Sequence, residues 1–69
     1  ASPLLAAQIL NQIGSLERST HPQTAIERYR RAIALAGSTP LTSLRAELWM
    51  NLGIAWQLAA EGRRGPLLE

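Results

Sequence analysis

The positions of three prolines constrain the fold of this chain more than any other feature. Pro3, Pro22 and Pro40 each follow a polar residue and precede an apolar, periodic segment. Proline suits the first turn of a helix because it has no backbone N–H to leave unpaired and its φ is already helical. Ser2 and Thr39 can cap the helices that follow them. The spacing predicts three helices, over residues 3–18, 22–36 and 40–60.

Apolar residues recur at helical spacing within the first two segments. In the first, Leu5, Ile9, Ile13 and Leu16 fall at i, i+4, i+8 and i+11, which predicts one buried stripe. The second segment carries a similar stripe of Ala25, Ile26, Tyr29, Ala32, Ile33 and Ala36. Gly37 follows it, and we expect this glycine to end the helix in a left-handed conformation.

The third segment is apolar around most of its circumference, which indicates packing on more than one side. Gly62, Gly65 and Pro66 are expected to end this helix near Ala60. The last residues, 67–69, then resemble the start of a short fourth helix. Val and Phe are absent, and β-branched and aromatic residues are scarce. This composition favours a single all-α domain over residues 1–69.

The composition excludes several classes of function. The chain has no Cys, one His and no Asp, so we expect no disulfide, metal site or cofactor. No nucleophile–base pair or phosphate-binding loop is recognisable, and we expect no enzyme activity. There is no signal-peptide pattern and no apolar run of about 18 residues, so the sequence favours a cytoplasmic protein outside the membrane.

A repeat links the first and third segments. Ile13-Gly14 and Leu52-Gly53 are 39 residues apart and stand at the same relative point of their helices. The pattern Trp49-x2-Leu52-Gly53-x2-Trp56 resembles the first-helix signature of the tetratricopeptide repeat, W-x2-L-G-x2-Y. The pattern Ala25-x3-Tyr29-x2-Ala32 resembles its second-helix signature. Asn51 and Ala55 also agree with the usual pattern.

The resemblance implies an antiparallel three-helix fragment of a right-handed solenoid: one complete helical hairpin and the first helix of the next repeat. In that arrangement the small residues allow close approach of helices, while the aromatic residues fill the wedges between them. The positions that carry these structural roles are Gly14, Ala25, Tyr29, Ala32, Trp49, Leu52, Gly53 and Trp56.

The resemblance also implies a binding surface, because such solenoids bind partners on the concave face lined by the first helix of each repeat. On the first helix this face would comprise Gln8, Asn11, Gln12, Ser15 and Arg18. On the third helix it would comprise Glu47, Met50, Asn51, Ile54, Gln57 and Leu58. It suits an extended or helical peptide with apolar anchors and few charges. Alternatively, Met50, Ile54 and Leu58 pack against a neighbouring helix, an adjacent repeat of a longer chain, or a second copy.

Three functional hypotheses follow. The leading one is a non-catalytic scaffold module that recognises a protein segment. The second is a homo-oligomerisation domain that buries its apolar rows against another copy. The third is nucleic-acid binding through Arg28, Arg30, Arg31 and Arg45. The third is the least favoured, because the net charge is only +2 and these arginines suit a solvated face partly paired with Glu27.

Overall fold

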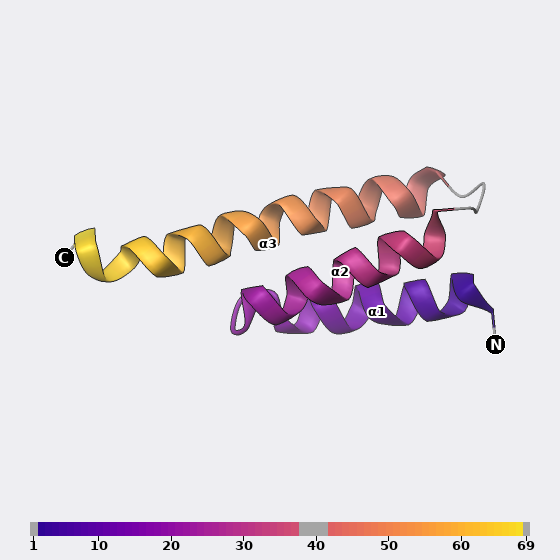
Figure 1. Cartoon of the computed structure of the whole chain (residues 1–69), viewed down its shortest axis with the longest axis horizontal. Coiled ribbons are helices and arrows are strands. Elements are labelled where there is room, and N and C mark those ends of the chain that lie inside the picture. Colours follow the sequence, from indigo (N-terminus) through magenta and orange to yellow (C-terminus); the bar gives the residue numbers. More distant parts are fainter. Residues whose placement is uncertain (1, 38–41, 69) are drawn as a thin grey trace.

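The chain forms three helices in the computed structural model (Figure 1). The structure describes the backbone of residues 2–37 and 42–68, and the side chains of residues 2–37 and 42–62. Helix α1 spans Pro3–Glu17, α2 spans Pro22–Ala36 and α3 spans Thr42–Leu68. Consecutive helices run in opposite directions. The prediction of an all-α fold is confirmed.

The starts of α1 and α2 follow the proline pattern. Ser2 is the N-cap of α1, and its Oγ accepts a hydrogen bond from the Leu5 N–H at 3.4 Å. His21 is the N-cap of α2, but its side chain makes no capping bond. The Glu17 carbonyl closes the turn between the two helices by accepting the N–H groups of Thr20 at 3.2 Å and His21 at 2.6 Å. These contacts fix α2 directly beside α1.

The end of α3 differs from the prediction. The helix does not stop near Ala60 but continues to Leu68, so Leu67 and Leu68 do not begin a fourth helix. A glycine costs a helix only about 1 kcal/mol relative to alanine, and therefore weakens a helix without forbidding it. Pro66 lies close to the end of the helix, where few backbone bonds remain to be lost. The predicted start of this helix, Thr39-Pro40, lies outside the described residues.

The end of α2 also corrects the prediction. Gly37 has φ −60° and ψ −26°, which is the ordinary right-handed region. No residue among those described has a positive φ. The helix therefore ends without a left-handed cap, and the absence of a side chain at position 37 is not required by its backbone conformation.

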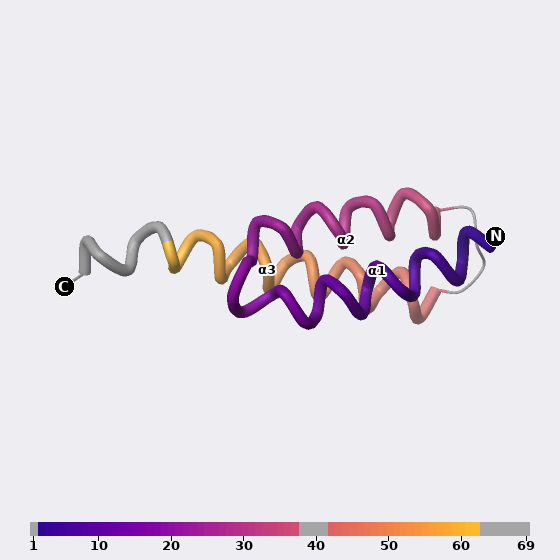
Figure 2. Tube along the Cα trace, turned by 90° about the horizontal axis from the view of Figure 1, so that it is seen from below, coloured from indigo at the N-terminus to yellow at the C-terminus, as the bar shows by residue number. Residues whose placement is uncertain are grey.

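Helix α2 is the centre of the packing, with α1 and α3 both lying along it (Figures 1 and 2). The core between the helices is built mainly from small residues. Six of the ten buried apolar residues in the described part are alanines. Only Tyr29 and Leu48 are large and fully buried. The complete set is Ala7, Ala25, Ile26, Tyr29, Ala32, Ala36, Leu48, Leu52, Ala55 and Ala59.

Gly14 allows the close approach of α1 and α2. A Cβ placed at this position would lie 2.8 Å from Cε1 and 2.9 Å from Cζ of Tyr29, closer than real contacts allow. Tyr29 itself is completely buried against this point. Gly14 thus lets α1 lie close to Tyr29 of α2, and Ala25 and Ala32 beside it are fully buried.

The predicted roles of Gly53 and the two tryptophans are wrong for this structure. A Cβ added at Gly53 would meet nothing within 4 Å. Trp49 and Trp56 are 58% and 49% exposed, so they fill no wedge between the described helices. The reason is geometric: α3 packs on α2 through Leu48, Leu52, Ala55 and Ala59, and the tryptophans project from another side of the helix.

Candidate functional site

A directed chain of hydrogen bonds joins α1 to α3. Arg18 Nη1 donates to Asn51 Oδ1 at 3.1 Å, and Asn51 Nδ2 donates to Asn11 Oδ1 at 2.9 Å. Asn11 Nδ2 in turn donates to a carboxylate oxygen of Glu47. The chain thus begins at a cation and ends at an anion, and both buried amides are satisfied. These bonds are among the few direct contacts between α1 and α3, which are otherwise held together through their packing on α2.

This series of hydrogen bonds changes the role assigned to four of the predicted binding residues. Asn11 and Asn51 are only 7% exposed and bind each other, so their side chains do not line an open face. Arg18 and Glu47 are more accessible, but each donates to or accepts from one of the asparagines. The four residues hold the helices together, because a buried amide without its partner would be costly.

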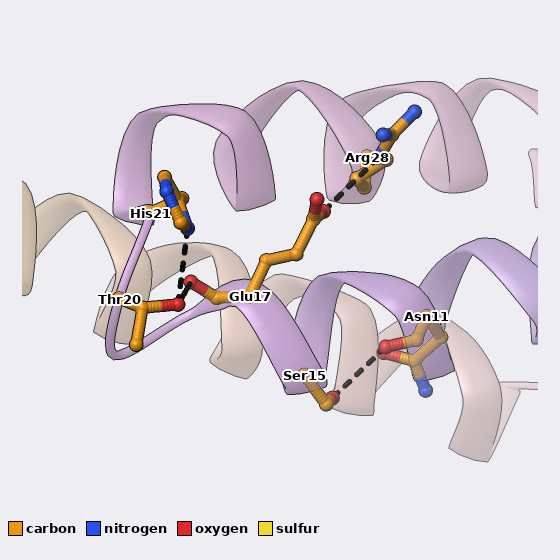
Figure 3. A network of polar contacts seen from close by, with 6 residues as sticks. All are labelled: Asn11, Ser15, Glu17, Thr20, His21 and Arg28. Atoms are coloured by element: carbon orange, nitrogen blue, oxygen red, sulfur yellow. Dashed lines mark hydrogen bonds and ion pairs between the residues drawn. The ribbon is translucent and has the colours of Figure 1, made fainter.

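A second set of polar contacts fixes the turn between α1 and α2 (Figure 3). Arg28 Nε forms an ion pair with Glu17 Oε1 at 3.1 Å. Thr20 Oγ1 lies 3.1 Å from His21 Nδ1 and donates to the Glu17 carbonyl at 3.5 Å. Ser15, another predicted binding residue, donates to the Asn11 carbonyl at 2.9 Å and lies 3.1 Å from the Tyr29 hydroxyl. These contacts all have a structural role.

The free side of α3 is the most distinctive surface of the molecule. It carries the two half-exposed tryptophans together with Met50, which is 60% exposed, and the exposed charges of Arg45 and Glu61 lie beyond its two ends. Gly53 lies between the tryptophans and faces open space. We name this surface the tryptophan face and define it by six exposed residues: Ala46, Trp49, Met50, Gly53, Trp56 and Gln57.

The repeat shows what the tryptophan face lacks. Each of its six positions lies 39 residues after a position of α1 or its C-cap that is buried or half-buried: Ala7, Leu10, Asn11, Gly14, Glu17 and Arg18. On α1 these positions pack against α2 or bond to α2 and α3. On α3 none of the described helices covers the matching positions. The tryptophan face is therefore shaped like a helix-packing surface but is open.

A hollow extends the tryptophan face towards α2. Trp56 and Ala59 border it on α3, and Ile26, Glu27 and Arg30 border it on α2 together with Gln23. Apolar and charged side chains thus line this hollow together. A second open hollow, lined by His21, Pro22, Gln23, Thr24, Ala59 and Gly62, lies at the start of α2.

The remaining predicted binding residues divide between the surface and the packing. Met50 and Gln57 are exposed and belong to the tryptophan face, while Gln8 and Gln12 are exposed on α1. Ile54 and Leu58 are half-buried. The structure therefore brings Met50 and Gln57 together with the tryptophans, which the sequence assigned to the interior of the solenoid.

The exposed apolar row of α1 is a feature that the sequence pattern placed in the wrong environment. Leu5, Ile9 and Leu16 were expected in the core, but they are 55%, 48% and 81% exposed. The side of α1 that packs on α2 instead carries Ala7, Asn11 and Gly14. Small residues at i, i+4 and i+7 were the available signal, because close helix packing needs small side chains as much as large ones.

Among the arginines whose side chains the structure describes, one forms an ion pair, Arg18 donates to Asn51, and the others are exposed. Arg28 is paired with Glu17, rather than Glu27 with Arg31 as i, i+4 spacing suggests. Arg30, Arg31 and Arg45 are exposed. Within residues 2–37 and 42–68, no helix combines the length and apolar character needed to cross a bilayer.

Comparisons with known protein families, characterised proteins and solved structures gave no match. The resemblance to the tetratricopeptide repeat therefore stays a prediction carried by its residues.

Proposed function

We propose that the chain is a non-catalytic protein-interaction module of tetratricopeptide type that receives a helix on the tryptophan face. The observation that carries the proposal is the contrast between two equivalent glycines: Gly14 lies against the buried ring of Tyr29, whereas Gly53 has nothing within 4 Å. A cytoplasmic location, expected from the sequence, belongs to the same proposal.

The chemistry of the face supports an apolar helix as the ligand. The six residues that define it include no charge, so a charged peptide would lose water without gaining an ion pair. Covering the exposed half of each tryptophan would remove on the order of 100 Å² from water, which contributes about 2 kcal/mol per side chain. Glu27 and Arg30, which line the neighbouring hollow with Trp56, can contact the polar side of a bound helix.

The packing of α2 on α1 supplies a template for the ligand. Ala25, Tyr29 and Ala32 on α2 are completely buried, and the tyrosine ring lies over Gly14. A helix that presents small residues on either side of one aromatic ring would place that ring over Gly53. This pattern distinguishes the proposed ligand from an extended peptide, whose alternating side chains could not follow the helical ridge of α3.

A synthetic helix with the sequence of residues 21–37 tests the proposal. Because short helices are marginal in water, positions 27 and 31, both exposed in the protein, carry a covalent staple. Both tryptophans of the chain lie on the tested face and the peptide has none, so tryptophan fluorescence reports binding directly. We expect a saturable blue shift of the emission.

Two controls make the titration specific. A stapled peptide with the equivalent of Tyr29→Ala should bind at least about tenfold more weakly, since it lacks the ring that would cover Gly53. The protein variant Gly53→Leu should keep its circular dichroism spectrum, because the site is open, but lose the fluorescence change. An emission spectrum that no stapled peptide alters up to millimolar concentration would refute the proposed function.

A further inference from the structure

We infer that a second copy of the chain supplies the helix: the outer face of α1 in one molecule packs on the tryptophan face of α3 in the next. The inference rests on the proposed function, because it names the partner of that same face. We define the outer face of α1 by Leu5, Ile9 and Leu16.

The outer face of α1 fits the tryptophan face in chemistry, with large aliphatic side chains in place of the tyrosine ring that covers Gly14 within one molecule. Its three residues are all about half exposed or more, and they lie on the side of α1 opposite Ala7, Asn11 and Gly14. No residue of α1 from Pro3 to Leu16 is charged. The residues that define the two faces carry no charge, so contact between them removes large apolar groups from water on both sides and leaves Arg45 and Glu61 at the edge of the contact.

The distribution of large side chains indicates that burial is incomplete in one copy. In the described part of the chain, the exposed large apolar residues are Leu5, Ile9, Leu16, Trp49, Met50 and Trp56. All six belong to the two outer helices. The core, in contrast, consists mostly of alanines. A chain of this size buries only about 60% of its surface, so moving these six residues out of water would add substantially to a thin core.

The contact is expected to be head to tail. The outer face of α1 is a narrow aliphatic row about 16 Å long, and the tryptophans bracket Gly53 over about 10 Å of α3. A symmetric contact of α3 with α3 would leave the row on α1, including the 81% exposed Leu16, in water. The free side of α2 is not expected to form the contact between copies, because it carries the charged residues Glu27, Arg30 and Arg31. Unlike faces generate rings or open chains of copies.

Two double variants test this arrangement, each blocking one face. Ile9→Glu with Leu16→Glu places charge on the outer face of α1, and Trp49→Glu with Trp56→Glu places charge on the tryptophan face. Sedimentation velocity from about 10 µM to about 1 mM measures the oligomeric state. We expect the unchanged chain to form species larger than a dimer as concentration rises, and each double variant alone to stay monomeric. An equimolar mixture of the two should form dimers and nothing larger, because it retains one intact joint.

Three outcomes overturn the inference. The first is a strictly monomeric unchanged chain at 1 mM. The second is a self-associating Ile9→Glu/Leu16→Glu variant, which would show that α3 pairs with α3. The third is an equimolar mixture that stays monomeric although circular dichroism shows both variants folded. If a double variant does not fold, the single variants Leu16→Glu and Met50→Glu, at exposed positions, replace it and must give the same pattern. Binding of the stapled peptide to a monomeric chain would preserve the proposed function while refuting self-association.

Discussion

Gly14 and Gly53 hold matching places on the outer helices but meet different surroundings, and the same substitution separates them. In Gly14→Ala, the new Cβ would press on the buried ring of Tyr29 at 2.8 Å. Alanine gains about 1 kcal/mol over glycine in a helix, but overpacking a core typically costs about 1–3 kcal/mol. We expect a net loss of up to about 2 kcal/mol in the free energy of unfolding, measured by urea denaturation.

Gly53→Ala is the matched control. Nothing lies within 4 Å of its Cβ, so the gain in helix propensity should remain, and the chain should be stabilised by about 0.5–1 kcal/mol. Both variants are to be measured at low micromolar concentration, where association does not contribute. Equal effects of the two substitutions would contradict the different environments of the glycines.

The asparagine pair makes a second prediction at the scale of single residues. Asn51→Ala removes the acceptor of Arg18 and the donor to Asn11, and leaves buried polar groups unpaired. We expect it to cost about 1–3 kcal/mol of stability. Combined with Asn11→Ala, the loss should be smaller than the sum of the single losses by about 0.5–2 kcal/mol, because each single change already breaks the shared bond. A thermal-unfolding double-mutant cycle measures this coupling.

The exposed Gln12 provides the control for that cycle. Gln12→Ala should change stability by less than about 0.5 kcal/mol. Additive losses from Asn11→Ala and Asn51→Ala would show that the hydrogen bond between them contributes nothing beyond the packing of each side chain.

At the scale of the helices, the sequence predicts the starts better than the ends. Pro3 and Pro22 mark helix starts because proline fixes φ locally, whatever lies beyond it. Gly62 and Pro66 did not end α3, because each only adds a cost that the rest of a long helix can offset. The sides of the helices were the hardest to assign. Leu5 and Leu16 follow helical periodicity as well as a core residue does, and only the partner helix decides which side is buried.

Leucine-to-alanine substitutions at two positions test which side of an outer helix packs against α2. Leu48 is fully buried against α2, and Leu16 is 81% exposed. Leu48→Ala should cost about 2–4 kcal/mol, because it removes buried methyl groups and leaves a cavity. Leu16→Ala should change the stability of the monomer by less than about 0.5 kcal/mol. Urea denaturation at low micromolar concentration measures both, and a large loss from Leu16→Ala would place that residue in the core.

At the scale of the whole molecule, the arrangement is a charged middle helix between two apolar outer faces. The all-α fold and the helix starts at Pro3 and Pro22 could be foreseen from residue types and spacing. The open tryptophan face could not, because Trp49-x2-Leu52-Gly53-x2-Trp56 specifies a packing surface without specifying which helix covers it. The series of hydrogen bonds from Arg18 through the two asparagines to Glu47 could not be predicted for a similar reason. The sequence does not show which polar residues of α1 and α3 meet until the two helices are placed in space.

The uncharged faces predict how association responds to salt. Contacts between exposed charges weaken as the screening length falls from about 30 Å at 0.01 M salt to about 3 Å at 1 M, and phosphate binding by arginines weakens steeply in the same range. Burial of the tryptophan face against the outer face of α1 depends neither on ion pairs between exposed charges nor on phosphate binding. The dissociation constant of the self-associated chain should therefore change less than about threefold between 0.05 and 0.5 M sodium chloride, and sodium sulfate should tighten it, because excluded salts favour apolar burial. Sedimentation equilibrium measures both effects. A dissociation constant that rises tenfold or more with sodium chloride would assign the contact to Arg30, Arg31 or Arg45 and not to the tryptophans.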